Sequence, residues 1–147
     1  MTTPEFVERF ADISTTPEPD LASAALFIAK IEYPQLDVSK YLAQLDEMGR
    51  VAAARIAALG ENSDPLARIT EMSSYLFKQE GFTGNQNNYD DLRNSFLNEV
   101  LDRRTGIPIS LSIVYMEVAR RAGVEIHGVN FPGHFLLKVP TLSLIHI

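Results

Sequence analysis

The segment Pro108–Arg121 constrains the fold of this chain most strongly, because it is helical in pattern and apolar on almost every side. Around such a helix, large apolar side chains point in nearly every direction: Ile109, Leu111, Ile113, Val114, Tyr115, Met116 and Val118. A helix of this kind must be covered by other elements on most sides. We therefore predict that it is the central helix of the fold, opened by Pro108 and ended by Gly123.

Three amphipathic helices are predicted ahead of the central helix. The first runs over Leu21–Glu32 with Asp20 as its N-cap, and the second runs over residues 38–59, where apolar residues recur every three or four positions. The third starts in residues 62–65, which combine capping residues with a proline, and it reaches Phe77. The first helix is expected to carry an apolar face made of Leu21, Ala24, Ala25, Ile28 and Ile31.

Residues 81–89 are rich in glycine and asparagine, and we expect them to form an exposed loop. After this loop, Asn94 is predicted to cap a short helix that Gly106 closes. This short helix lies between the loop and the central helix in the sequence. The residues of the short helix that are expected to face the core are Phe96, Leu97, Val100 and Leu101.

Two strands are predicted after the central helix, over residues 124–130 and 134–139. A turn formed by Phe131, Pro132 and Gly133 is expected to join them. Helices followed by strands indicate the α+β class. We therefore expect the central helix to pack on an antiparallel sheet that is incomplete within this chain.

The chain is expected to divide into a helical N-terminal region at residues 1–89 and a core at residues 90–141. Residues 142–147, LSLIHI, form an apolar stretch without a helix cap or turn residues. This stretch can be back-translated to a transposon end sequence that serves as a sequencing adapter. We therefore expect it to be a non-native tail and the core to be truncated.

The charge distribution argues against a nucleic-acid partner. The 147 residues carry a formal net charge of -6, and the basic residues are scattered apart from the pairs Arg103-Arg104 and Arg120-Arg121. Neither pair forms a patch that would bind a phosphate backbone. The N-terminus lacks the layout of a signal peptide, and no apolar run approaches the roughly 18 residues that cross a bilayer. We expect a cytoplasmic protein without a membrane partner.

The chain contains no cysteine, which excludes disulfides, thiolate metal sites and thiol catalysis within it. This absence matters because a covered helix followed by strands, one of which opens with His134, is the layout of papain-like and transglutaminase-like cores. In such a layout the helix N-terminus lowers the pKa of a thiol, and a histidine on a strand accepts the proton. Here no thiolate can form.

Residues 94–138, NSFLNEVLDRRTGIPISLSIVYMEVARRAGVEIHGVNFPGHFLLK, resemble the bacterial SirB family. The blocks NSFLN, RRTGIPISLS and FPGHFLLK carry the likeness and stand in order. The resemblance implies a transglutaminase-like (papain-like) core, typically followed by tetratricopeptide repeats. Related segments occur in some eukaryotic F-box proteins.

The resemblance also implies roles for individual residues. Gly106 matches the glycine that precedes the transglutaminase cysteine, Arg120 and Gly123 match the signal at the helix end, and His134 matches the histidine of the triad. Counting back from Gly123 without gaps places the nucleophile position on Pro108. The acidic residue that completes the triad would lie beyond residue 141.

A shift of one helical turn would place Ser110 at the nucleophile position instead, which leaves two interpretations open. Ser110 is either a nucleophile with His134 as its general base, or, like Ser112, a serine whose hydroxyl satisfies free amides in the first turn of a helix. His134 is correspondingly a base or a histidine that caps a strand. His127 and His134 lack a third ligand at a recognisable spacing, so we expect no metal ion.

These observations favour a non-catalytic module that acts in regulation or protein interaction. The alternative is a hydrolase or acyltransferase that uses Ser110 and His134. The apolar turn formed by Phe131, Pro132 and Gly133 could line a groove beside the helix N-terminus, and this groove would bind a peptide or a partner protein. No cofactor is expected.

Overall fold

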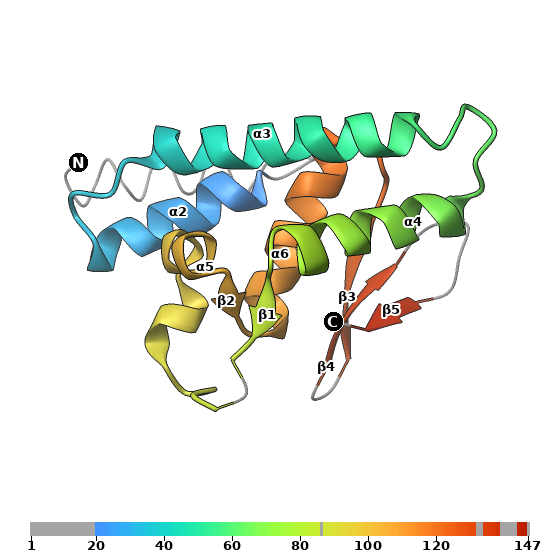
Figure 1. Cartoon of the computed structure of the whole chain (residues 1–147). Helices are drawn as coiled ribbons and strands as arrows, with labels where there is room; N and C mark the ends of the chain where they lie inside the picture. The colour runs from blue at the N-terminus through green and yellow to red at the C-terminus, as the bar shows by residue number, and fades with distance from the viewer. Residues whose placement is uncertain (1–19, 86, 132–133, 139–143, 147) are drawn as a thin grey trace.

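The computed structural model of the chain describes residues 20–85, 87–131, 134–138 and 144–146. No helix among these residues is long and apolar enough to cross a membrane. The helices are α2 (Leu21–Glu32), α3 (Val38–Ala57), α4 (Pro65–Ser73), the π-helix η1 (Ser74–Gln79), the 3-10 helix η2 (Leu92–Ser95), α5 (Leu97–Arg103) and α6 (Pro108–Arg121). The strands are β1 (Thr83–Gly84), β2 (Thr105–Gly106), β3 (His127–Phe131), β4 (His134–Lys138) and β5 (Leu144–His146) (Figure 1).

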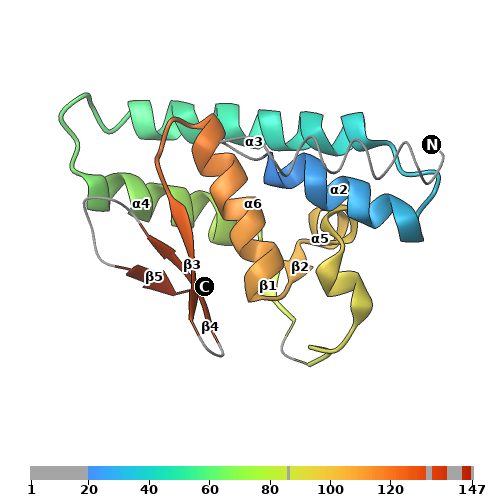
Figure 2. The ribbon, with the colours of Figure 1, turned by 180° about the vertical axis from the view of Figure 1, so that it is seen from behind.

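The prediction of a central helix is confirmed, because α6 has the expected bounds and packs against α2, α3 and α5. Figure 2 shows α6 between α5 on one side and the strands β3 to β5 on the other. Among the large apolar side chains of this helix, Ile109 is the exposed one. Gly123 follows the helix with φ +80°, a conformation that favours glycine. The buried residues of α6 are Ser110, Leu111, Ser112, Val114, Tyr115, Glu117, Val118 and Ala119.

The helices α3 and α6 approach each other closely at Gly49. A Cβ atom added to Gly49 would lie 2.3 Å from the Cβ atom of Arg121, much closer than two carbon atoms can approach. Glycine is therefore required at this crossing, where it lets the backbone of α3 pack directly against α6.

A buried carboxylate on α6 connects three helices. Glu117 accepts a hydrogen bond from the backbone N–H of Ala22 at 2.8 Å, and it forms ion pairs with Arg120 and Arg121, each at 2.7 Å. Arg121 also pairs with Asp46 on α3 at 2.7 Å. Burial opposes the charge of Arg121, but hydrogen bonds with Asp46 and Glu117 outweigh it and raise the pKa of the guanidinium. The network therefore fixes α2 and α3 on α6.

The helix α2 has its predicted bounds, and the side chain of Asp20 accepts the N–H of Ser23 at 3.0 Å as an N-cap. The predicted apolar face is wrong, however, since Ile28 and Ile31 are 45% and 68% exposed. Apolar residues lie on two sides of this helix, so the spacing of apolar residues in the sequence could not show which side is buried. The hydrogen bond from the Ala22 N–H to Glu117 directs the side that contains Ala22 toward α6 and the core. The buried residues are Ala22, Ser23, Leu26, Phe27 and Ala29.

The second and third predicted helices are also present, and α3 ends two residues before the expected position. Asp64 caps α4, with Pro65 in its first turn. The segment then continues as the π-helix η1, in which the N–H of Glu80 reaches the carbonyl of Tyr75 at 2.9 Å, five residues back. Gly81 ends it with φ +78°.

The strands form two separate sheets, so the chain has the expected mixture of helices and strands. The strands β1 and β2 form a parallel pair, in which Thr83 lies opposite Thr105 and Gly84 lies opposite Gly106. The strands β3 and β4 are antiparallel, as are β4 and β5. The expected sheet was antiparallel, and the parallel pair departs from that expectation.

The parallel pair was missed because a strand of two residues has no hydrophobic periodicity. Residues 81–89 were expected to be an exposed loop, but Phe82 is buried and is followed directly by β1. The strand β3 begins at His127 rather than at residue 124. The strand β5 lies within residues 142–147, whose origin stays a prediction.

One hydrophobic core contains residues from both of the expected regions of the chain. Leu26 and Leu45 come from the first region, and Val100 and Tyr115 come from the second. The core is therefore continuous across residue 90, and the division of the chain at that residue stays a prediction.

We expect Glu117→Gln to lower the free energy of unfolding by about 1–3 kcal/mol, because the Ala22 N–H and the Arg121 guanidinium, which keeps Asp46, lose a charged and buried partner. The matched control is Glu47→Gln, which removes a largely exposed ion pair with Arg50 and should leave the unfolding midpoint unchanged. Chemical denaturation followed by circular dichroism measures both variants. Equal midpoints for the two variants would show that the buried carboxylate does not hold the helices together.

Candidate interaction site at the start of the central helix

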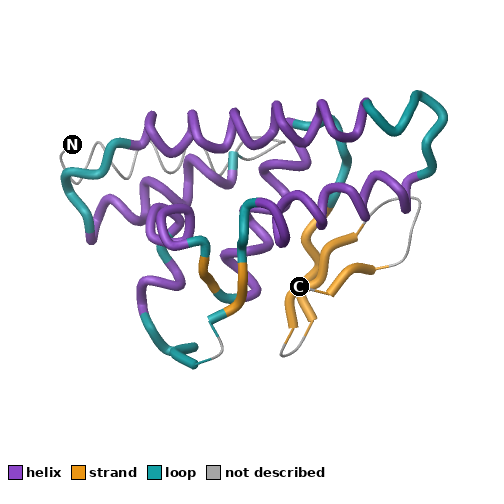
Figure 3. Tube along the Cα trace, in the orientation of Figure 1, coloured by secondary structure: helices purple, strands orange, loops and turns teal. Residues whose placement is uncertain are grey.

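Asn94 organises the loop that precedes the central helix. It was expected to cap a helix, but α5 begins after Phe96, and no side chain caps it. Asn94 is instead fully buried, and its side chain donates to the carbonyls of Asn88 and Tyr89 at 2.9 and 3.2 Å. Its side-chain oxygen accepts from the amide of Asn85 at 3.0 Å. The loop after β1, teal in Figure 3, therefore folds around one buried amide.

Ser110 connects this loop to the first turn of α6. Its hydroxyl donates to the backbone carbonyl of Asn94 at 2.6 Å and accepts from the N–H of Ile107 at 3.1 Å. Only 4% of the residue is exposed. Both hydrogen-bonding roles of the hydroxyl are thus satisfied by backbone groups.

Pro108 occupies the first position of α6, where a proline costs no backbone hydrogen bond. Ser112 lies one turn later, and its buried hydroxyl donates to the carbonyl of Pro108 at 2.6 Å. The candidate nucleophile Ser110 and its neighbour Ser112 therefore both hydrogen-bond to the backbone.

Gly106 lies where the backbone must approach Ser110 closely. A Cβ atom at this position would be 2.7 Å from the hydroxyl oxygen of Ser110 and 3.2 Å from a methyl group of Val100. Any side chain here would displace one of these neighbours. Glycine at residue 106 therefore permits the contact between β2 and the start of α6.

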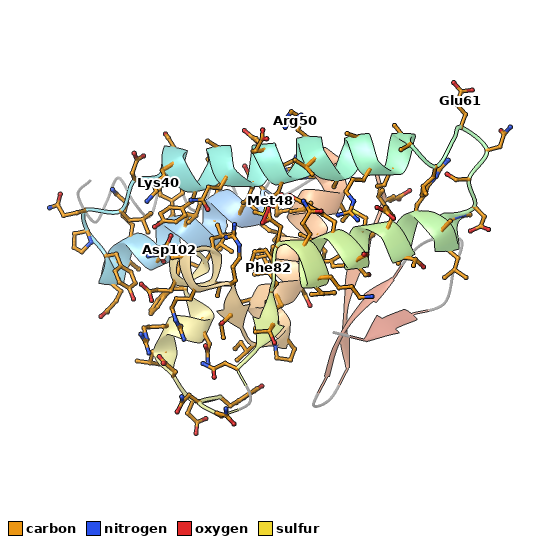
Figure 4. All side chains as sticks on the ribbon, in the orientation of Figure 1. Lys40, Met48, Arg50, Glu61, Phe82 and Asp102 are labelled. Carbon is orange, nitrogen blue, oxygen red and sulfur yellow. The ribbon has the colours of Figure 1, made fainter. Side chains whose placement is uncertain are left out.

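Arg104 ends α5, two residues before the predicted end at Gly106. It has φ +56°, the left-handed conformation that is unusual for a residue with a side chain. Its guanidinium lies 4.9 Å from the ring centre of Phe82, 3.6 Å from the carboxylate of Glu80, and also bonds the carbonyl of Leu101. Phe82, labelled in Figure 4, is buried beside β1. Arg104 thus joins the segment before β1 to the end of α5.

An ion pair holds the start of η2. The guanidinium of Arg93 binds the carboxylate of Asp91 at 2.7 Å. Hydrogen bonds from the side chain and then the backbone of Arg93 lower the pKa of Asp91 to about 2. Asp91 therefore remains ionised down to acidic pH and caps η2.

Three large side chains around this site are exposed to solvent. Tyr89 is 60% exposed, Leu92 is 75% exposed and Ile109 is 51% exposed. The carbonyl of Tyr89 accepts a hydrogen bond from Asn94, Leu92 lies two residues before Asn94, and Ile109 directly precedes Ser110. These three apolar side chains stand among exposed polar residues, which include Asn88, Asp90 and Arg93.

The structure places the backbone of His134 at the start of β4, opposite Phe131 in β3. Pro132 and Gly133 lie outside the described residues, and no side chain of β3 or β4 is described. The relation of His134 to Ser110 therefore stays a prediction. Among the residues described, no group of three His, Cys, Asp or Glu side chains could hold a metal ion.

Sequence reasoning identified Gly106, Pro108 and Ser110 but missed Asn94 and Arg104 as organisers of the site. Asparagine in the segment before a helix is an ordinary cap signal, so nothing local indicated that Asn94 would be buried. The left-handed conformation of Arg104 likewise has no signal in the sequence, since glycine or asparagine is usual there.

Comparison with known proteins places most of this structure in one family. A family model described as the transglutaminase-like superfamily matches residues 39–145. The UPF0162 protein of Xylella fastidiosa (strain Temecula1 / ATCC 700964) is 42% identical over 120 residues, which cover 82% of this chain and 42% of that protein. The UPF0162 protein of Pseudomonas aeruginosa is 38% identical over 125 residues, which cover 83% of this chain and 44% of that protein.

A third relative comes from a eukaryote. F-box only protein 21 of Homo sapiens is 48% identical over 70 residues, which cover 48% of this chain and 11% of that protein. No solved structure matches the chain significantly. The chain spans about two fifths of the length of the bacterial relatives and about a tenth of the human relative.

We expect Gly106→Ala to lower the free energy of unfolding by about 1–3 kcal/mol, because its methyl group would meet the hydroxyl of Ser110. Ser110→Ala should cost about 1–3 kcal/mol, because the buried carbonyl of Asn94 loses its donor. In the double variant the clash is relieved, so the combined loss should fall about 1 kcal/mol short of the sum.

Urea denaturation of the wild type, both single variants and the double variant measures this coupling. Gly84→Ala is the matched control, since a Cβ atom there would have no atom within 4 Å, and we expect it to leave stability unchanged. Strictly additive losses at residues 106 and 110 would show that the two residues do not constrain each other.

Proposed function

Because the chain belongs to the transglutaminase-like superfamily, we propose that it acts as a non-catalytic module for regulation or protein interaction. The narrower proposal is membership of the SirB family, supported by the ordered blocks NSFLN, RRTGIPISLS and FPGHFLLK. We also propose that the whole protein carries tetratricopeptide repeats and that it is located in the cytoplasm. A protein or peptide is the proposed partner.

The state of the Ser110 hydroxyl is the observation that carries this proposal. A serine nucleophile needs a neighbouring base that takes its proton and donors that stabilise an oxyanion. Here the hydroxyl proton is directed at the carbonyl of Asn94 at 2.6 Å, and the oxygen accepts the N–H of Ile107. Attack on a substrate would break both bonds inside a buried site, and each unpaired group would cost free energy.

The other groups at the start of α6 offer no stronger nucleophile. Pro108 occupies the position that the family resemblance assigns to the nucleophile, and the chain has no cysteine. Ser112 is fully buried and donates to a backbone carbonyl. The serines at the start of α6 therefore fix the local backbone and are poorly placed to form a covalent intermediate.

The related human segment supports a modular role. The matched segment makes up about a tenth of F-box only protein 21. In the UPF0162 protein of Xylella fastidiosa it makes up about two fifths. A similar segment therefore occurs within larger proteins of different size. This occurrence in larger proteins is compatible with a module that works beside other domains.

A fluorophosphonate probe for serine hydrolases tests the non-catalytic proposal. We expect no labelling of the wild-type chain above the level of the denatured protein, because the Ser110 hydroxyl is buried and donates to the backbone carbonyl of Asn94. An active serine hydrolase in the same tube confirms that the probe reacts. Labelled protein is measured by gel fluorescence.

The variants Ser110→Ala, His134→Ala and Ser112→Ala distinguish specific labelling from background. Labelling of the wild type and Ser112→Ala that disappears in Ser110→Ala and His134→Ala would overturn the proposal and establish the hydrolase alternative. A circular dichroism spectrum of each variant shows whether loss of signal reflects unfolding.

A further inference from the structure

We infer that two copies of this chain form a dimer by exchanging α2, so that the helix of each copy packs on the core of the other. In the single chain α2 packs on a surface formed by α3, α5 and α6, which we call the α2-binding surface. A second copy carries the same helix and therefore fits the same surface. Such a dimer is a further property of the chain, separate from the proposed function.

The helix α2 is held on this surface by a polar contact at its start and by an apolar stripe along its length. Glu117 accepts the N–H of Ala22 at 2.8 Å and so satisfies one of the free amides at the helix N-terminus. Ala22, Leu26 and Ala29 are each 0% exposed and lie on one side of the helix. These contacts do not depend on which chain supplies the helix, so exchange preserves them.

The helix α2 lies outside the part of the chain that the transglutaminase-like family model matches. The match covers residues 39–145, whereas α2 ends at Glu32. The parts of α5 and α6 that receive α2 therefore belong to the family core, and a short segment joins α2 to that core. An element that is joined to the rest of a fold in this way can be exchanged between identical chains at low cost.

Residues 33–37 are the hinge for this exchange, since they connect α2 to α3. In the single chain the hinge makes a turn, in which the N–H of Leu36 binds the carbonyl of Tyr33 at 3.0 Å. The ammonium group of Lys30 binds the carbonyls of Leu36 and Pro34 at 3.0 and 3.4 Å. Opening the turn breaks these bonds, and α3 can then extend back to Pro34, because proline is accepted in the first turn of a helix. Short hinges are a route to exchange between chains.

Two large apolar side chains near the hinge are exposed in the single chain, and exchange gives them a partner. Ile28 is 45% exposed and Ile31 is 68% exposed, and Ile31 lies three residues before Pro34. In a two-fold dimer formed by exchange, both chains cross between the subunits at their hinges. The hinge-proximal ends of the two α2 helices therefore lie near each other. Contact between their isoleucines adds apolar burial that the single chain lacks.

Shortening the hinge is expected to convert the chain to the exchanged dimer. Deletion of Pro34 and Gln35 leaves only Tyr33, Leu36 and Asp37 between α2 and α3, so the turn that returns α2 to its own core is lost. Size-exclusion chromatography with light scattering should give twice the 16.4 kDa of one chain. The matched control inserts Gly-Gly after Gln35 and should favour the single chain. A shortened chain that is folded by circular dichroism and stays monomeric would overturn the inference.

Because the chain has no cysteine, single thiols can show the exchange directly with the hinge at its full length. The rings of Tyr33 at the end of α2 and Phe96 before α5 lie 5.5 Å apart. The variants Tyr33→Cys and Phe96→Cys, one of them with a small tag, are unfolded together, refolded at high concentration and treated with a short bismaleimide. We expect a covalent heterodimer on a denaturing gel. The control pairs Tyr33→Cys with Glu61→Cys, since Glu61 lies beyond the far end of α3 (Figure 4). Equal yields from the two mixtures would overturn the inference, whether or not the shortened chain folds.

The contribution of the exposed isoleucines is measured separately, by analytical ultracentrifugation over a dilution series. We expect the double variant Ile28→Ser, Ile31→Ser to raise the Kd of the dimer about tenfold or more, because the apolar contact near the hinges is lost. Leu66→Ser is the matched control, since Leu66 is 62% exposed on α4, and it should leave the Kd unchanged. Wild-type chain that sediments as a monomer at every concentration, together with the absence of the cross-linked heterodimer, would refute the exchange.

Discussion

The fold depends on the buried carboxylate of Glu117. A helix as apolar as α6 can be covered in many ways by apolar neighbours, because hydrophobic burial has no direction. The carboxylate adds direction, since it binds the N-terminus of α2 and the guanidinium of Arg121, which in turn reaches Asp46 on α3. Two helices are thereby held at defined positions on α6, and Gly49 allows α3 to come close.

Local signals predicted the helices well, because caps and prolines act within one turn. Asp20, Asp64 and Pro108 each start a helix where expected. The buried face of α2 could not be predicted, since it depends on Glu117, which is 95 residues away in the sequence. The parallel pair was missed because its strands have two residues each, too few for a periodic pattern, and because Thr83 meets Thr105 only in the folded chain.

The sequence did not indicate how the residues at the start of α6 are held together. The sequence pointed to the start of α6 through Gly106, Pro108 and Ser110. It did not show that Asn94 would be buried there and would bind both the preceding loop and Ser110. A serine and an asparagine each form local hydrogen bonds in many settings, and only the tertiary arrangement decides which bonds form.

The π-helix η1 has a consequence for how this protein can vary in length. In η1 the N–H of Glu80 reaches back five residues instead of the usual four. Deleting one residue there would restore the ordinary helical spacing and rotate everything downstream by about 100° around the helix axis. Phe82 would then leave the core. A change of length in the segment that leads into β1 would therefore disturb the core.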